Sequence, residues 1–141
     1  MEHKQLLTVF NSLPVGIGFF TADGTLVRCN ESFCRIFGAD SQTLLGNKLN
    51  INENSVVPDV VKEAVRRCVP VQMSFLYDFD KQRTDKRFFS TRTRTCYLKC
   101  NGNPLYDNDG KFVNYIFIFE DITETVKSEE VLRQSRRKTE L

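Results

Sequence analysis

Lys-Phe-Val-Asn-Tyr-Ile-Phe-Ile-Phe-Glu-Asp-Ile-Thr, residues 111–123, is the stretch that decides the fold. Its aromatic and β-branched run, residues 112–119, is short and rich in strand formers, and the turn signal Asn108-Asp109-Gly110 precedes it, so a strand is predicted. Alternation along this strand makes both of its faces apolar: Val113, Tyr115, Phe117 and Phe119 on one, Ile116 and Ile118 on the other. We therefore expect it in the centre of a sheet, with each face covered.

The segment after this strand has a different character. Residues 124–141 are rich in charged side chains and contain neither glycine nor proline, which favours a helix. The turn Asp121-Ile122-Thr123 would then join a core strand directly to an exit helix. A connection of that kind can carry a signal out of the domain.

Length and composition indicate one globular domain. The chain has 141 residues, of which 40% are hydrophobic and 11% aromatic, enough to bury a real core. No apolar run approaches the 18 or so residues of a membrane span, and the N-terminus lacks a signal peptide. The sequence predicts a cytoplasmic protein with no membrane contact by this segment, unless it is excised from a longer membrane protein.

The five cysteines are odd in number and scattered, without a Cys-x-x-Cys pair or a neighbouring histidine. This pattern predicts free thiols and no metal site. Cys96 and Cys100 lie four residues apart in a predicted strand, which is too far for good chelation. A small enzyme that acts through Cys34 or Cys68 is a further, weaker hypothesis.

Residues 81–100 concentrate positive charge, with seven basic side chains against one acid, Asp85. A nucleic-acid groove with Phe88, Phe89 and Tyr97 as stacking platforms would have this composition. A solvated basic edge of a sheet, which discourages edge-to-edge aggregation, is the commoner explanation. The sequence favours the edge and leaves the nucleic-acid module as the alternative function.

Hydrophobic periodicity gives the order of elements. A helix is predicted over residues 3–13, strands over 15–22 and 25–28, short helices over 30–38 and 41–45, a helix over 56–68, a strand over 71–79, a polar connection over 80–86, and a strand over 88–105 before the strand at 112–119. Tight turns join most of the strands, so they pair antiparallel. The expected fold is α+β, a five-stranded antiparallel sheet with short helices across one face and flanking helices at both termini.

Several short motifs recur in the order and spacing of a known family. They are Leu13-Pro14-Val15-Gly16-Ile17, Asp23-Gly24-Thr25-Leu26, Asn30, Phe33, Phe37-Gly38, Leu44-Leu45-Gly46, Asn103-Pro104-Leu105, Asp109-Gly110, Asp121-Ile122-Thr123-Glu124 and the stretch 129–135. Together they resemble the PAS sensor domains of bacterial sensor histidine kinases and related signalling proteins. The resemblance divides the chain into an N-terminal helix (1–13), a PAS domain (14–123) and a linker helix (124–141).

The resemblance implies a function and a set of partners. It implies a sensory or dimerisation module of a cytoplasmic signal-transduction protein, which couples a ligand or partner to the exit helix through Asp121, Ile122 and Thr123. A homodimer, a downstream signalling domain in the same chain and a small apolar ligand are the expected partners. The parent protein would be a histidine kinase, whereas this chain itself would not be an enzyme.

Two groups of apolar residues are candidates for binding. A pocket between the helix at 56–68 and the sheet would be lined, or simply filled, by Phe33, Phe37, Val61, Val65, Met73, Phe75, Cys96, Leu98, Ile116 and Ile118. A dimer interface would be formed by Leu6, Phe10, Leu13, Tyr115 and Phe117.

Known cofactor chemistries of the family are disfavoured by the sequence. Haem-binding members carry a ligating histidine on the long helix, whereas the one histidine here, His3, lies outside the core region. Flavin photoreceptors carry a Asn-Cys-Arg-Phe-Leu-Gln pattern, and Cys34-Arg35-Ile36-Phe37 lacks its flanking asparagine and sits on an earlier helix. The cofactor, if any, stays unknown, and no phosphate-binding loop or nucleophile elbow is present.

Overall fold

The computed structural model describes residues 2–83 and 90–140. Its helices and strands are α1 (Glu2–Ser12), β1 (Gly16–Phe20), β2 (Leu26–Cys29), α2 (Glu31–Phe37), α3 (Ser41–Gly46), the 3-10 turn η1 (Ile51–Glu53), α4 (Asp59–Arg67), β3 (Val71–Asp78), α5 (Phe79–Arg83), β4 (Thr95–Tyr106), β5 (Phe112–Asp121) and α6 (Thr123–Glu140). Within these residues, no helix is long and apolar enough to cross a lipid bilayer.

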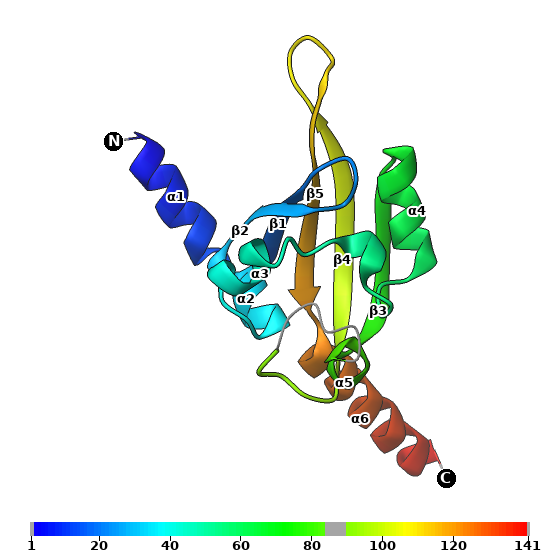
Figure 1. The fold of residues 1–141 in the computed structure, drawn as a ribbon. Helices are drawn as coiled ribbons and strands as arrows, with labels where there is room; N and C mark the ends of the chain where they lie inside the picture. The colour runs from blue at the N-terminus through cyan, green and yellow to red at the C-terminus, as the bar shows by residue number, and fades with distance from the viewer. Residues whose placement is uncertain (1, 84–89, 141) are drawn as a thin grey trace.

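The five strands form one antiparallel sheet in the order β2-β1-β5-β4-β3. The strand β5 is central, as its apolar faces predict, and the expected α+β fold is confirmed. Helices α2, α3 and α4 lie across one face of the sheet, while α1 and α6 project from opposite ends of the domain (Figure 1). The hairpin between β4 and β5 extends beyond the body of the sheet (Figure 1).

Helix α2 begins and ends where its sequence signals predict. The side chain of Asn30 accepts a hydrogen bond from the backbone N–H of Phe33 at 3.0 Å, which caps the N-terminus. Gly38 adopts φ 67°, the left-handed conformation that commonly ends a helix, and its N–H donates to the carbonyl of Cys34. The short helix is therefore fixed at both ends by local chemistry.

Three predicted boundaries were wrong. The predicted connection at 80–86 begins with helix α5, because the carboxylate of Asp78 caps it by accepting from the N–H groups of Asp80 and Lys81 at 3.0 Å each. Helix α4 starts at Asp59 rather than at residue 56, since Pro58 biases the residue before it toward extended backbone. Strand β4 starts at Thr95; residues 88 and 89, which were assigned to this strand, lie outside the described residues.

The two faces of β5 were assigned the wrong way round. Tyr115, Phe117 and Phe119 point into the helix-covered core and are 0%, 0% and 3% exposed. The prediction that Tyr115 and Phe117 form a dimer interface is therefore wrong, because neither reaches the surface. Ile116 and Ile118 alternate with them and lie half-buried on the opposite face, so neither can line a pocket beneath the helices.

Glycines on the neighbouring strands explain this orientation. Phe117 of β5 is paired with Gly18 of β1 on one side and with Gly102 of β4 on the other. A Cβ atom on Gly18 would lie 2.8 Å from Cε2 of Phe33, and one on Gly102 would lie 2.7 Å from Cε1 of Phe117. The helix-covered face is thus the face on which missing side chains make room for aromatic rings.

Candidate functional site

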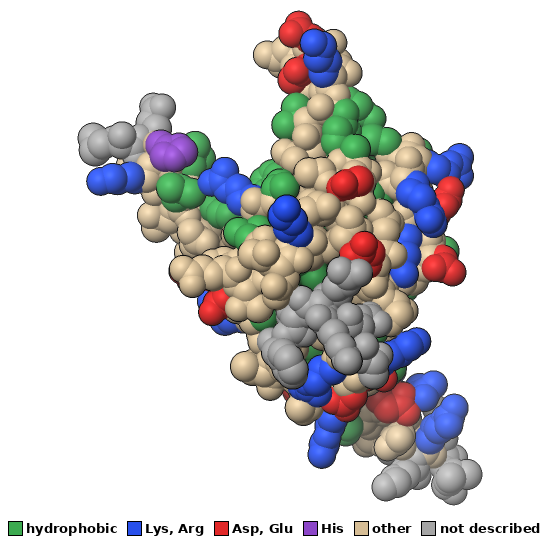
Figure 2. Space-filling view, viewed as in Figure 1, with side chains coloured by type: hydrophobic (Ala, Val, Ile, Leu, Met, Phe, Trp, Pro, Cys, Tyr) green, Lys and Arg blue, Asp and Glu red, His purple; other side chains and the backbone are tan. Residues whose placement is uncertain are grey.

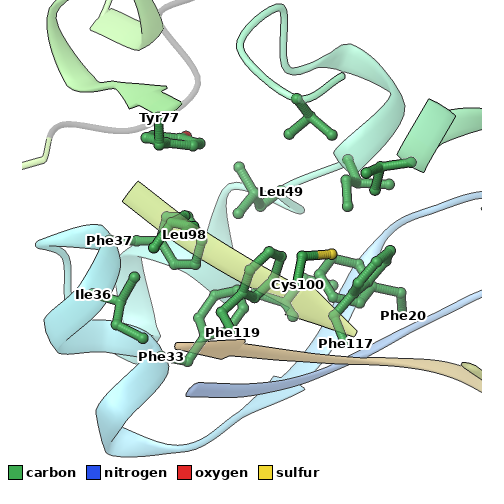
Figure 3. Packing of buried hydrophobic residues seen from close by; sticks show 14 of the residues in the cluster. Phe20, Phe33, Ile36, Phe37, Leu49, Tyr77, Leu98, Cys100, Phe117 and Phe119 are labelled. Atoms are coloured by element: carbon green, nitrogen blue, oxygen red, sulfur yellow. The ribbon is translucent and has the colours of Figure 1, made fainter. Parts of the chain in front are cut away.

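A small cavity lies in the aromatic core, between the sheet and the helices. Figure 3 shows the buried hydrophobic side chains of this core. Its volume is about 30 Å³, and its lining residues are Phe20, Phe33, Phe37, Leu49, Asn50, Ile51, Asn54, Val57, Phe75, Tyr77 and Phe119. One water molecule occupies about 30 Å³ in the liquid, whereas pockets for drug-sized ligands measure roughly 300–1,000 Å³. In this conformation the core is filled by its own side chains.

Aromatic rings fill most of that space. The ring centroids of Phe33 and Phe37 lie 4.6 Å apart, and Phe119 packs edge-on against Phe37 at 5.3 Å. Phe37 also meets Tyr77 edge-on at 5.3 Å. Figure 3 shows these rings converging from α2, β3 and β5. Edge-to-face packing of this kind holds α2 against the centre of the sheet.

The structure separates the predicted pocket residues into three groups. Phe33, Phe37 and Phe75 line the cavity. Others are buried elsewhere in the core or at its margin: Val61, Val65, Met73, Cys96 and Leu98. Ile116 and Ile118 lie on the far face of the sheet. Helical spacing in α2 and α4 and alternation in β3 and β4 found the first two groups, but alternation could not place the faces of β5 correctly.

One side of the cavity is polar, which sequence reasoning missed. The amide nitrogen of Asn54 donates to the hydroxyl of Tyr77 at 2.8 Å, and its amide oxygen accepts from the N–H of Val56 at 3.0 Å. Asn54 is 8% exposed and Tyr77 is 1% exposed. The segment 47–55 carries little periodic signal, so nothing in its pattern predicted a buried asparagine. These bonds place one polar pair of side chains, Asn54 and Tyr77, in a cavity wall that is otherwise mainly aromatic and aliphatic.

The thiols and the histidine lie apart from this cavity. Burial raises the pKa of Cys96 to about 11 and that of Cys100 to about 12, which is typical of inert structural thiols. Cys34 lines a groove at the surface, and burial raises its pKa, opposite to what a nucleophile needs. Cys68 follows α4 at φ 57°, and His3 lies on α1.

No metal centre is apparent in the described part of the chain. Residues 2–83 and 90–140 contain no cluster of three or more His, Cys, Asp or Glu side chains that could hold a metal ion.

The start of α6 is bonded to the sheet through the Asp121-Ile122-Thr123 turn. The carboxylate of Asp121 accepts from the N–H of Thr123 at 3.0 Å and so satisfies one of the free amides at the start of the helix. The hydroxyl of Thr123 accepts from the N–H of Tyr97 at 3.0 Å, and the N–H of Ile122 donates to the carbonyl of Tyr97 at 2.9 Å. The start of α6 therefore extends the backbone pairing between β5 and β4 by one further position, Tyr97.

A single arginine extends these contacts into the core. The guanidinium of Arg92 lies 3.1 Å from the carboxylate of Asp121 and donates to the carbonyl of Ile36 in α2 at 2.9 Å. It also lies over the ring of Phe79 in α5, 4.7 Å from the ring centroid. We call the contacts among Arg92, Asp121 and Thr123 the exit joint. This joint links α2, α5 and the start of α6 through one side chain.

Electrostatics favour the charged form of Asp121. Burial by itself would raise the pKa of this carboxyl group, but hydrogen bonds from Thr123 and the Arg92 guanidinium outweigh burial, and the pKa is lowered. The side chains of Arg92 and Asp121 are 32% and 29% exposed. The ion pair is thus shielded enough to be stronger than a fully exposed surface pair.

The basic segment at 81–100 is partly used inside the domain. Arg83 forms an ion pair with Asp80 at 2.8 Å and donates to the carbonyl of Ser90 at 3.2 Å. Arg92 is held in the exit joint. Phe88 and Phe89, the proposed stacking platforms, lie outside the described residues. Two of the seven positive charges thus brace the fold, which weakens the nucleic-acid hypothesis.

The N-terminal helix is attached through Asn30, a residue that is 1% exposed. Its amide nitrogen donates to the carbonyls of Phe10 and Val15 at 2.9 Å each, while its amide oxygen accepts from the N–H of Ile17 at 2.8 Å and from that of Phe33. All four hydrogen-bonding positions of the amide are satisfied. One side chain therefore ties α1, β1 and α2 together.

The outward side of α1 is apolar and open. Leu6 and Val9 are 69% and 54% exposed, and Figure 2 shows hydrophobic side chains along this helix. Phe10 packs on Phe19 of β1 at 6.0 Å between ring centroids. An open groove of about 420 Å³ follows this side; its lining residues are His3, Leu6, Leu7, Val9, Phe10, Leu13, Phe19 and Arg28.

Comparison with known proteins identifies the family to which this chain belongs. The sequence matches the family described as PAS fold over residues 10–127, so the chain belongs to the PAS family, a family of sensory and signalling domains. The resemblance predicted from the short motifs is thereby confirmed. A search of curated proteins found no match to this chain.

Solved structures share the fold at low sequence identity. An RNA-binding light-oxygen-voltage receptor superposes with a TM-score of 0.70 and 19% identity over 96% of this chain, which spans 37% of that chain. The PAS domain of a protein from Colwellia psychrerythraea gives 0.65 and 15% over 88% of this chain and 99% of that one. A domain of a sensor histidine kinase/response regulator from Geobacter sulfurreducens gives 0.57 and 15%, over 85% and 94%.

Proposed function

We propose that this chain is the sensory module of a signal-transduction protein, in which the state of the aromatic core is passed to α6 through the exit joint. The observation that carries the proposal is the double contact of Arg92, which binds the backbone of α2 and the carboxylate of Asp121 at once. A change in α2 can therefore alter the contacts that hold the start of α6.

The input is proposed to act on α2. Phe33 and Phe37 of this helix form part of the cavity wall, and Ile36 between them provides the carbonyl that Arg92 binds. A small apolar ligand or a partner that displaces these rings would also move that carbonyl. The Arg92 guanidinium can follow the carbonyl or keep its ion pair with Asp121, and either response changes the exit joint.

The output is proposed to lie beyond α6 in the same polypeptide. A histidine kinase is the output domain that we favour, and solved kinase-associated domains such as that from Geobacter sulfurreducens share the fold. Because their identity to this chain is low, they support the architecture and leave the output as a proposal. In this scheme the protein is cytoplasmic, and this chain itself performs no catalysis.

A test of the exit joint uses Arg92→Ala with Arg66→Ala as the matched control, since Arg66 is an exposed arginine paired only with Glu63 one turn away among the described contacts. Amide hydrogen exchange at Ile122 and Val126 reports opening of the first turn of α6. We expect faster exchange at both amides in Arg92→Ala and unchanged exchange in Arg66→Ala. Equal exchange in the two variants would remove the basis of the proposal.

We further propose that the chain forms a homodimer through the apolar side of α1. Leu6 and Val9 are too exposed for a helix that stays alone in water, and Leu13 and Phe10 continue the same side toward the sheet. A second copy would cover this side by placing its own α1 against it. Tyr115 and Phe117 have no part in this interface.

Light scattering on Leu6→Asp tests the dimer, with Thr8→Asp as the control because Thr8 is exposed on the opposite side of α1 and receives the same charge. We expect Leu6→Asp to be monomeric at concentrations where Thr8→Asp and the unmodified chain are dimers. A dimer that persists in Leu6→Asp, or a monomer in all three proteins, contradicts this interface.

A further inference from the structure

Two cysteine thiols face each other at the junction of β2 and α2. The sulfur atoms of Cys29 and Cys34 lie 3.9 Å apart. Cys29 is the last residue of β2 and Cys34 lies in the second turn of α2, with the capping residue Asn30 between them. A disulfide bond has an S–S length of about 2.05 Å, so the two sulfurs need to approach by about 1.9 Å.

Solvent reaches this pair of thiols. Both cysteines are half-buried, and both line an open surface groove of about 620 Å³. Three charged side chains, those of Arg28, Glu31 and Arg35, line the same open groove, so small water-soluble reagents can enter it. In contrast, Cys96 and Cys100 are 1% and 0% exposed in the core.

We propose that Cys29 and Cys34 form a redox-modification site, at which a peroxide converts the dithiol to an intramolecular disulfide. One thiol attacks the peroxide to give a sulfenic acid and one molecule of water or alcohol. The second thiol then displaces the hydroxyl group as water and closes the S–S bond. The two sulfurs together lose two electrons and two protons, and a thiol reductant reverses the change by exchange. The site does not depend on the signalling function proposed above.

The modification acts on the attachment of α1. Asn30 lies inside the six-residue segment 29–34 that the disulfide would close, and its side chain donates to the carbonyls of Phe10 and Val15 at 2.9 Å each. Drawing the sulfurs together shifts the backbone on both sides of Asn30. Because hydrogen bonds weaken steeply with distance and angle, the oxidised form holds α1 less firmly than the reduced form.

The raised pKa values of the two thiols set the rate at which they are oxidised. Burial, and then the neighbouring thiol, raises the pKa of Cys29 to about 12, and burial also raises the pKa of Cys34. Both thiols are protonated at neutral pH, and the thiolate is the reactive form. Oxidation is therefore slow near neutrality and about tenfold faster for each pH unit above it, until the thiols themselves titrate.

Peptide mapping of the whole chain tests the site. Trypsin cleaves after Arg28 and Arg35 and releases residues 29–35, a peptide that contains both cysteines and no other. After treatment with hydrogen peroxide and alkylation of the unfolded protein, we expect this peptide to be unlabelled and lighter by two hydrogen atoms. Full recovery of two alkylated cysteines, or separate sulfinic acids on each, would overturn the proposal. The disulfide should persist in Cys68→Ser, and its loss there would also count against the site.

Amide exchange tests, without any variant, whether the disulfide disturbs Asn30, the side chain that holds α1. The N–H groups of Ile17 and Phe33 both donate to the side-chain oxygen of Asn30. We expect their exchange to be several-fold faster in the peroxide-treated protein and to return to its original rate after a thiol reductant. A disulfide that forms without changing either rate would overturn the coupling to α1.

Discussion

Replacing Asn30 with alanine is expected to destabilise the domain strongly, because this one amide satisfies four backbone groups in three elements. The groups are the carbonyls of Phe10 and Val15 and the N–H groups of Ile17 and Phe33, and Asn30 itself is 1% exposed. Alanine provides none of these bonds. The variant also loses the cap of α2.

The size of the effect follows from those contacts. A typical hydrogen bond contributes about 1 kcal/mol net, so four give about 4 kcal/mol, of which the helix cap accounts for about 1 kcal/mol. Water can reach the exposed end of α1 and replace part of this loss. The expected decrease in the free energy of unfolding is therefore about 3 kcal/mol.

Urea unfolding measures this decrease directly. We expect the midpoint to fall while the slope with urea stays constant, because the surface exposed on unfolding does not change. Asn103→Ala serves as the control, since Asn103 is exposed on β4 and should change stability by less than about 0.5 kcal/mol. A loss below about 1 kcal/mol in Asn30→Ala would refute the role assigned to this residue.

Three further predictions concern the turn after α2, the exit joint and the core. Gly38→Ala should lower the free energy of unfolding by more than about 1 kcal/mol, because φ is 67° and a Cβ would lie 2.5 Å from the Ser90 hydroxyl oxygen. Gly46→Ala, with open space around the residue, should be nearly neutral, and thermal unfolding compares the two variants. Asp121→Asn should be less stable than the unmodified chain at pH 7, and the difference should vanish as the pH falls through the lowered pKa of Asp121, below about 4. A difference that is constant from pH 7 to pH 2 would contradict this. Leu98→Ala, at a residue that is 0% exposed, should cost about 2–5 kcal/mol in urea unfolding, and a loss under 1 kcal/mol would contradict the packing described.

The sequence was sufficient for the fold wherever a local signal has one structural meaning. Asn30 and Gly38 marked the two ends of α2, and the apolar run at 112–119 marked the central strand. The order of motifs then indicated the PAS family, which the family comparison confirmed. Such signals succeed because capping and alternation depend on neighbours along the chain.

The orientation of β5 could not be read from the same signals. Alternation separates Phe117 from Ile118 but does not say which face the helices cover, since both faces are apolar. The face that the helices cover is marked by Gly16 and Gly18, two residues apart on β1, because these glycines are paired with Phe119 and Phe117 and leave room for large rings. Their meaning depends on the register between strands, which only the fold establishes.

The exit joint was found only in part. Asp121 and Thr123 were predicted as the point where a signal leaves the domain. Thr123 does connect α6 to β4 by accepting from the N–H of Tyr97, and Asp121, the last residue of β5, accepts from the N–H of Thr123. Arg92 was counted instead within a basic surface segment. Its contacts with Asp121 and Ile36 join positions 29 and 56 residues away, and no periodic pattern encodes a contact at such separations.

A double-mutant cycle between Phe37 and Arg92 most directly tests whether α6 senses the core. Phe37→Leu perturbs the cavity wall beside Ile36, and the exchange rate of the Val126 amide, which donates to the carbonyl of Ile122, reports the first turn of α6. We predict that Phe37→Leu speeds this exchange in the unmodified chain and has no further effect in the Arg92→Ala background. The same acceleration in both backgrounds would show that Arg92 does not carry the coupling.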